Sequence, residues 1–178
     1  MNDVLCNTKY LQLKSTQCQA GGNWVYAHRP NAENVVVILP HTENEILFLI
    51  EKRPPIIAEN IGTYCIALPA GLVGDERKGE STEEAIKAEL LEEAGLVAEK
   101  IDIAAQKVAS SAGCTSEVCT IAIAKIRDKK PIQQPINDGG VIADRIWVNK
   151  KQVKDWLKRM EEKGYILTGQ TLAALFYL

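Results

Sequence analysis

The residues best suited to chemistry are three glutamates, Glu89, Glu92 and Glu93, in the acidic stretch at 80–95. At about 100° per residue, a helix through this stretch places the three carboxylates within an arc of about 100°. Like charges four residues apart destabilise an isolated helix by roughly 0.2–0.5 kcal/mol per pair. The cluster therefore indicates a compensating cation, and a set of oxygen ligands favours a hard one, Mg²⁺ or Mn²⁺.

An ordinary surface helix is the alternative interpretation, because Glu is a good helix former and charge runs usually form a solvated face. The neighbouring residues favour a site. Ser81 and Glu84 form a capping box that predicts the helix start, and Gly95 is a natural C-cap. The acidic arc is flanked by an apolar stripe of Ile86, Leu90, Leu91 and Ala94. We therefore expect an amphipathic helix at 82–94 with its acidic side at the edge of the buried face.

The elements that must position this helix follow from the rest of the pattern. With 178 residues, of which 46% are hydrophobic, the chain can bury one good core. We expect one domain at 31–178, preceded by an extension at 1–30 with short strands at 11–13 and 24–27. Further strands are expected at 35–39, 45–51, 101–108, 117–126 and 145–148, and further helices at 151–163 and 168–178. The segment 63–68 leads into a glycine turn, and 127–140 is a loop. This mixed order predicts an α+β fold with a mixed sheet flanked by helices.

Charge and cysteine content exclude several classes of protein. The net charge is −2, from 21 basic and 23 acidic residues, so no nucleic-acid partner is expected. The five cysteines are odd in number and lack C-x-x-C spacing, which argues against zinc or a disulfide framework and for a reducing, cytoplasmic location. No apolar run approaches a membrane span and no signal-peptide pattern is visible, so no membrane partner is expected.

At the acidic helix the chain resembles the Nudix hydrolases. That family's box runs Gly, five residues, Glu, seven residues, Arg-Glu, an aliphatic, any residue, Glu-Glu, any residue, Gly, an aliphatic. In that register lie Glu80, Glu89, Leu90, Glu92, Glu93, Gly95 and Leu96. The leading glycine is either Gly74, which fits the count, or Gly71, which fits the local motif P-A-G-L and which we favour.

The box arginine is replaced by Ala88. In the family this arginine is thought to hold a box carboxylate in place through an ion pair. Its loss puts metal affinity or catalytic rate in question, with Arg77, Lys78 and Lys87 as the nearby cations that could replace it.

Segments outside the box resemble the ADP-ribose pyrophosphatase branch of the family, over roughly 24–178. The segment 50–55 is similar to Q-Y-R-x-P, 66–71 to E-L-P-A-G, 110–117 to S-P-G-x-x-x-E, and 171–175 to the closing helix. The resemblance implies an α/β/α sandwich and a homodimer that exchanges its N-terminal strands. It also implies Mg²⁺- or Mn²⁺-dependent hydrolysis of the diphosphate bridge of ADP-ribose or a related nucleoside diphosphate sugar.

The resemblance also assigns roles to particular residues. The metal ligands expected are Glu89, Glu92, Glu93 and the carbonyl of Gly71, with Glu80 supporting them. Catalytic carboxylates besides Glu93 are Glu117 and Asp138, and Asp138 has the alternative of an ordinary Asp-Gly turn. Phosphate contacts are expected from Arg53 and Arg29, and Arg53 could instead be a surface residue at a strand end. Nucleobase stacking is expected from Trp24 and Tyr26, with ordinary packing in a strand as the alternative.

A second class of function stays open. A non-catalytic Nudix-fold protein that binds a nucleotide sugar and regulates a partner would tolerate Ala88 and the weakly acidic loop at 137–141. The three clustered glutamates argue against it, because a pure binder has less need of them.

Overall fold

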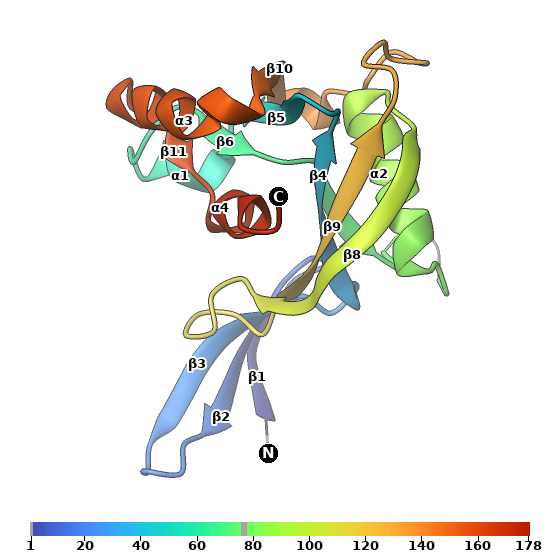
Figure 1. Cartoon of the computed structure of the whole chain (residues 1–178). Coiled ribbons are helices and arrows are strands. Elements are labelled where there is room, and N and C mark those ends of the chain that lie inside the picture. The colour runs from blue at the N-terminus through green and yellow to red at the C-terminus, as the bar shows by residue number, and fades with distance from the viewer. Residues whose placement is uncertain (1, 76–77) are drawn as a thin grey trace.

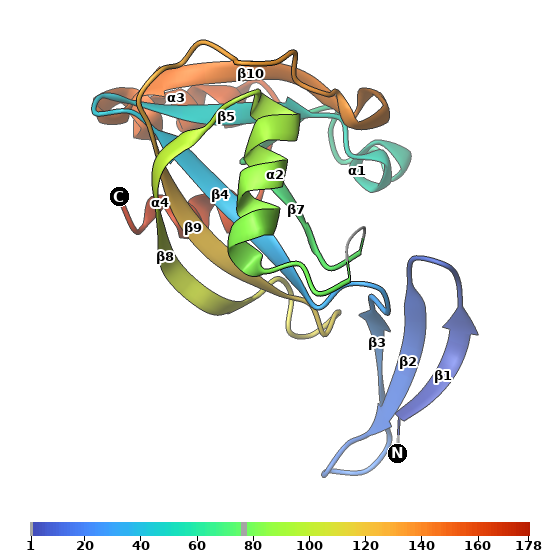
Figure 2. The same cartoon turned by 90° about the vertical axis from the view of Figure 1, so that its right-hand side faces the viewer.

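The computed structural model describes residues 2–75 and 78–178, which form two separate β-sheets (Figure 1). An antiparallel N-terminal sheet contains β1 (Asn2–Asn7), β2 (Gln12–Gln17) and β3 (Asn23–His28). It extends away from the main body, as Figures 1 and 2 show. Within the described ranges, no helix is both long and apolar enough to cross a membrane.

The main body is built on a mixed sheet of eight strands. Their bounds are β4 (Asn34–His41), β5 (Glu45–Glu51), β6 (Cys65–Ala67), β7 (Ala70–Val73), β8 (Ala98–Ala109), β9 (Val118–Ile126), β10 (Ile142–Asn149) and β11 (Ile166–Leu167). The order is β11-β6-β5-β4-β9-β8, with β10 added to β5 and β7 added to β4. Strand β4 is parallel to β9 and β6 is parallel to β11, while the other pairs are antiparallel.

Strands β4 and β5 pair next to their turn, where His41 faces Ile46. Away from this turn the two strands separate. Strand β4 pairs with β7 and β9, whereas β5 pairs with β6 and β10. The sheet therefore divides into two branches, and the space between the branches holds the candidate site.

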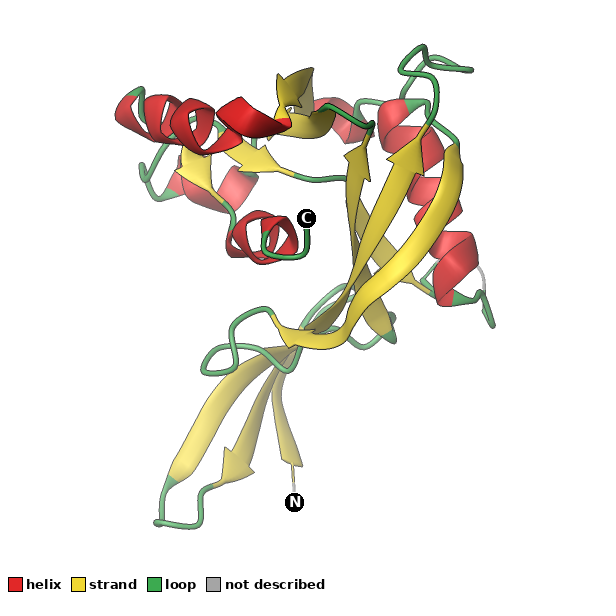
Figure 3. Cartoon of the chain, in the orientation of Figure 1, coloured by secondary structure: helices red, strands yellow, loops and turns green. Residues whose placement is uncertain are grey.

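Four α-helices flank the sheet: α1 (Pro54–Ala58), α2 (Thr82–Ala94), α3 (Val153–Glu162) and α4 (Gly169–Leu175). Successive side chains of a strand point to opposite faces. Along β4, Val36 and Ile38 join the core under α2, while Val37 and Leu39 join the core under α3 and α4. Figure 3 shows the helices on both sides of the strands. This arrangement confirms the predicted α+β sandwich with a mixed sheet.

Helix α2 has the predicted bounds because its end signals are local. Ser81 accepts a hydrogen bond from the Glu84 backbone N–H, and the Glu84 carboxylate accepts one from the Ser81 N–H. Gly95 ends the helix in the left-handed conformation at φ 70°, which glycine adopts without steric cost. Ile86 and Leu90 are fully buried against the sheet, each contributing roughly 1.5–3 kcal/mol. The buried stripe differs in one position, because Ala85 is buried while Leu91 is only half-buried.

Other elements differ from the sequence prediction. The strands β1, β6, β7 and β11 and the short helix α1 were not predicted, and β7 lies where a glycine turn was expected. Proline occupies the first turn of α1, and such a five-residue helix has almost no periodic signal. The last two helices are shorter than expected, because 150–152 form a 3₁₀ turn before α3, and α4 ends at Leu175. The loop at 127–140 contains no strand or α-helix in its described residues, only a 3₁₀ turn at Asp138–Gly140.

Candidate active site

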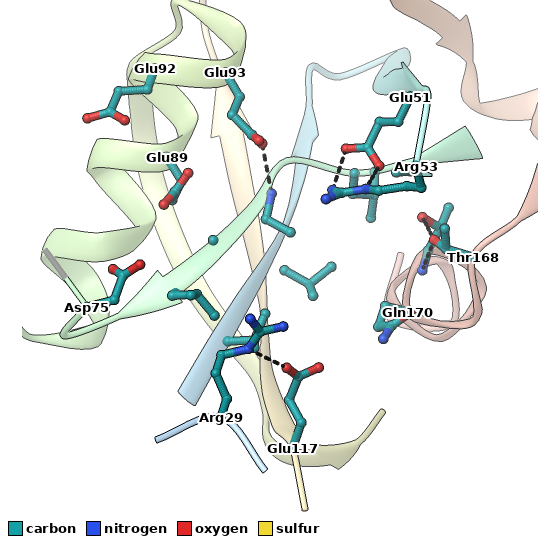
Figure 4. Close-up of a pocket in the computed structure, with 18 of the residues that line it drawn as sticks. Arg29, Glu51, Arg53, Asp75, Glu89, Glu92, Glu93, Glu117, Thr168 and Gln170 are labelled. Atoms are coloured by element: carbon teal, nitrogen blue, oxygen red, sulfur yellow. Dashed lines mark hydrogen bonds and ion pairs between the residues drawn. The ribbon is translucent and has the colours of Figure 1, made fainter. Parts of the chain in front are cut away.

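A cavity of about 610 Å³ lies between the two branches of the sheet. One wall is the acidic face of α2, with Glu89, Glu92 and Glu93. Figure 4 shows β7 beneath this wall and the start of α4, with Thr168 and Gln170, on the opposite side. The cavity also contains Arg29, Glu51, Arg53, Gly71 and Glu117. Seven of the ten residues proposed from the sequence as site residues thus line one cavity.

Gly71 lies directly beneath Glu89. A Cβ atom placed on Gly71 would be 1.8 Å from Oε1 of Glu89 and 1.9 Å from its Cδ. A Cβ on Gly74 would instead meet only Glu33, at 3.9 Å, and Gly74 has φ 84°. The structure therefore places Gly71, rather than Gly74, against the acidic face, and any larger residue at 71 would displace the Glu89 carboxylate.

Glu93 is the most buried of the three glutamates, with 8% of its surface exposed. Burial is the main cause that raises the pKa of its carboxyl to about 8, and the nearby carboxylates Glu89 and Glu51 act in the same direction. The Ala70 backbone N–H donates to Glu93 Oε2 at 2.9 Å, which acts in the opposite direction and favours the charged form. A cation in the cavity would do the same, because it would replace the lost hydration of the carboxylate.

The chemical type of the available ligand atoms fits a hard divalent cation, because carboxylate and carbonyl oxygens are the ligands of Mg²⁺ and Mn²⁺. The space that glycine leaves beneath Glu89 keeps the carboxylate close to the main chain of β7. Within the part of the chain that the structure describes, no three His, Cys, Asp or Glu side chains already converge on one point. In Figure 4 the carboxylate of Glu92 points away from those of Glu89 and Glu93. Binding a metal through all three glutamates therefore requires a side-chain rotation of Glu92, which is only half-buried.

Arg53 faces the cavity from the end of β5, where Glu51 holds it. The Arg53 Nε and Nη2 groups donate to the two carboxylate oxygens of Glu51 at 2.6 and 2.9 Å. Only 1% of Glu51 is exposed, so the pair fixes the guanidinium plane at the cavity. Sequence reasoning missed Glu51. The available signal was a charged residue that ends the apolar strand E-I-L-F-L-I-E, next to the predicted arginine.

A second arginine–carboxylate pair lies on another side of the cavity. Arg29 Nε donates to Glu117 Oε2 at 3.1 Å, and Ser110 Oγ donates to Glu117 Oε1 at 3.0 Å. Figure 4 shows this pair apart from the Glu51–Arg53 pair. Two guanidinium groups therefore face a cavity whose third side is acidic, which suits an extended phosphate-containing ligand.

Two predicted residues, Trp24 and Tyr26, are not among the described residues that line the cavity. Trp24 is half-exposed on β3, and its indole N–H donates to the Gly113 carbonyl at 2.9 Å. Tyr26, on the same strand, is partly buried. Asp138 begins a 3₁₀ turn, and its side chain lies outside the described part of the structure. Tyr10, which was not predicted, does line the cavity.

Of the three cations proposed to replace the box arginine, the structure describes two. Lys87 forms an exposed ion pair with Glu83 at 2.5 Å, and Lys78 is exposed. Arg77 lies outside the described residues. Ala88 borders a hollow of about 20 Å³, which is also lined by Glu80, Glu89 and Glu92.

A mixed sheet between helices, with an acidic helix face over a glycine strand, defines the class of fold that the sequence resemblance implied. Residues 30–168 match the sequence model of the NUDIX domain. The chain belongs to the Nudix family.

One protein of similar sequence and one solved structure of similar fold can be compared with this chain. An uncharacterized Nudix hydrolase of Schizosaccharomyces pombe is 33% identical over 119 residues, covering 65% of this chain and 53% of that protein. The match thus spans about half of that relative's length. The crystal structure of an ADP compounds hydrolase shares the fold, with a TM-score of 0.73 and 18% identity, over 99% of this chain and 89% of that one.

Proposed function

We propose that the protein is a metal-dependent pyrophosphohydrolase that cleaves the diphosphate bridge of ADP-ribose or a related nucleoside diphosphate sugar. The products would be a nucleoside monophosphate and a sugar phosphate. One observation carries the proposal: the acidic face of α2 and the two fixed arginines, Arg29 and Arg53, share one cavity. The name of the structural relative, an ADP compounds hydrolase, agrees with a substrate of this class.

Under this proposal Glu89, Glu92, Glu93 and the Gly71 carbonyl would hold Mg²⁺ or Mn²⁺. A bound divalent cation neutralises phosphate charge and lowers the pKa of bound water. The chain's own contribution is orientation. Arg53, held by Glu51, and Arg29, held by Glu117, would bind phosphate oxygens on either side of the scissile bridge.

The general base is Glu117 or Asp138. Both oxygens of Glu117 already accept hydrogen bonds, from Arg29 and Ser110, which favours a role in holding Arg29. Asp138 lies in the loop before β10. Replacing each carboxylate by its amide separates the two candidates, because loss of the base lowers kcat with little change in KM, whereas loss of an arginine orienter raises KM.

The stacking role of Trp24 and Tyr26 requires a second copy of the chain. We propose a homodimer in which the N-terminal sheets are exchanged, so that these aromatics reach the partner's cavity. The sheet exposes the apolar side chains Val4, Leu5, Leu11, Leu13 and Val25. Exposed apolar side chains on so small a sheet favour an interaction surface. Sedimentation of the full chain tests the proposal, and a monomer at micromolar concentration would contradict it.

Hydrolysis of a panel of nucleoside diphosphate sugars with Mg²⁺ or Mn²⁺ tests the proposed activity. We expect metal-dependent cleavage of ADP-ribose, reduced by about 100-fold or more in Glu93→Gln. Glu83→Gln is the matched control, because Glu83 lies on the same helix but is exposed and paired with Lys87. Equal losses in both variants would contradict the assigned metal face.

The alternative is a non-catalytic regulator that binds a nucleotide sugar. It is favoured by Ala88 and, among the described residues, by the lack of three converged metal-binding side chains. Calorimetry separates the two functions. A regulator would bind a member of the panel without cleaving it, and Glu93→Gln would leave its affinity largely intact.

A further inference from the structure

The last turn of α2, which carries Glu92 and Glu93, is held from outside the helix. Backbone carbonyls at a helix C-terminus have no partner within the helix. The Glu92 carbonyl accepts from the Ile136 backbone N–H at 2.7 Å, and the Glu93 carbonyl accepts from Nε of Arg145. The Leu91 carbonyl accepts from Nε2 of Gln133 at 3.2 Å and from the Gly95 N–H at 2.8 Å. The loop at 127–141 and strand β10 therefore fix the main chain of this turn.

Arg145 joins the acidic turn to the loop. Its Nη2 group donates to the Ile136 carbonyl at 2.7 Å, and Nη1 donates to Oδ1 of Asn137 at 3.1 Å. Arg145 is anchored on β10, where it faces Leu49 of β5 in the sheet register. Ile136 in turn lines the cavity. A single planar guanidinium thus sets the distance between the turn that carries two proposed metal ligands and a wall of the same cavity.

The loop lies tightly against the helix end. A Cβ atom on Gly95 would be 2.5 Å from the Gln133 carbonyl oxygen and 2.8 Å from Cβ of Pro131. A positive charge at a helix C-terminus also interacts favourably with the aligned backbone dipoles. Geometry and charge therefore both favour Arg145 at this position.

We propose that Arg145 is a positioning residue for the metal-binding face, acting through the Glu93 main chain. The inference rests on the proposed function only for its effect on turnover. Metal binding by the protein alone tests it separately. The side chains of Glu92 and Glu93 start from the turn that Arg145 holds, so loosening the turn should weaken their joint affinity for a cation.

The experiment compares Arg145→Met and Arg145→Lys with wild type and with Arg127→Met. Arg127 is the matched control, because its side chain is 81% exposed and pairs with Glu99 away from the cavity. Mn²⁺ affinity is measured without substrate, by the loss of the free-ion EPR signal, together with thermal unfolding. The metal concentration for half-maximal hydrolysis and the substrate KM at saturating metal are measured in parallel.

We expect Arg145→Met to weaken Mn²⁺ binding by about 10–100-fold, as is typical for residues that orient metal ligands. Arg145→Lys, which keeps the charge but loses the fork, should restore part of the affinity. Saturating metal should restore hydrolysis with a nearly unchanged KM. Unchanged Mn²⁺ affinity in both variants would overturn the inference, even if thermal stability fell. If Arg145→Met does not fold, the Mn²⁺ affinity of Arg145→Lys alone tests the inference, and an unchanged affinity would overturn it.

The outcomes also separate this inference from the proposed function. Wild-type protein that binds Mn²⁺ but cleaves no substrate would refute the hydrolase proposal. The role of Arg145 would then still be tested by the Mn²⁺ affinity of its variants. Wild-type protein without Mn²⁺ affinity would overturn the positioning role itself.

Discussion

The buried carboxyl group of Glu93 should make the stability of the metal-free protein depend on pH, and Glu93→Gln should remove that dependence. Burial raises its pKa from the ordinary 4.5 to about 8 in the folded protein. The folded state therefore binds this proton more tightly than the unfolded state does. The contribution is fully present below pH about 4.5 and is lost as the pH rises towards 8.

The size of the effect follows from the shift in pKa. A pKa difference of about 3.5 units lowers the free energy of unfolding by at most about 5 kcal/mol above pH 8. About 3 kcal/mol of this is already lost at pH 7. Glutamine has a similar shape and stays neutral, and its side-chain oxygen can still accept from the Ala70 N–H. The metal-free variant should therefore be more stable than wild type at pH 8.5 and similar to it at pH 4.5.

Urea denaturation of both proteins at pH 4.5, 7 and 8.5, with a chelator present, measures this difference. Subtracting the two curves removes the contributions of all other titrating groups. Saturating Mn²⁺ should reverse the order at pH 8.5, because a metal ligand must be deprotonated and a ligand bound to the folded state stabilises it. Parallel pH profiles without metal would refute the argument that burial of Glu93 is a destabilising cost.

Three further substitutions test single features of the site and its helix. Gly71→Ala should displace the Glu89 carboxylate, whose Oε1 would be 1.8 Å from the new Cβ, so a metal titration of activity should shift by about tenfold while the unfolding free energy changes by less than about 1 kcal/mol. A wild-type metal response would show that Glu89 does not bind the metal. Ser81→Ala removes the capping bond to the Glu84 N–H and should cost about 1 kcal/mol in urea denaturation. Ile86→Ala, at a position with 0% exposure, should cost about 2–5 kcal/mol in the same assay. A much smaller loss would mean that α2 packs loosely on the sheet.

How much of the fold was predictable depended on how local its signals are. Helix α2 was placed to the residue because Ser81, Glu84 and Gly95 signal its ends within the segment itself. Strand β11 has only two residues and exists because it pairs in parallel with β6. Strand β1 likewise follows from pairing with β2 rather than from any alternation in its own sequence. Such elements depend on partners that a single segment does not reveal.

The site residues likewise differ in how far the sequence alone reveals them. The glutamates of α2 share a helix face, so their spacing alone places them on one wall of the cavity. Arg53, Gly71 and Glu117, which were predicted from their motifs, also line it, as does Arg29. Glu51 was missed although its partner Arg53 is only two residues away, whereas Arg145 was missed because its contacts join segments far apart in the chain. Arg145 meets the Glu93 carbonyl 52 residues away in the chain, at a meeting point that the pairing of β10 with β5 determines.

One helix, α2, serves both the core and the site, which explains why Glu93 is both costly and useful. Its neighbours Leu90 and Ala94 are buried in the core under α2, so the carboxylate of the same turn is withdrawn from water together with them. A buried carboxylate without a partner destabilises the fold, but for the same reason it gains more from a cation than an exposed one does. In the absence of metal, the Ala70 N–H holds the Glu93 side chain and Arg145 holds the Glu93 main chain. Arg53 lines the same cavity. If the proposed metal site is correct, binding of a divalent ion would recover the stability given up at this turn and would couple the folding of α2 to occupation of the site.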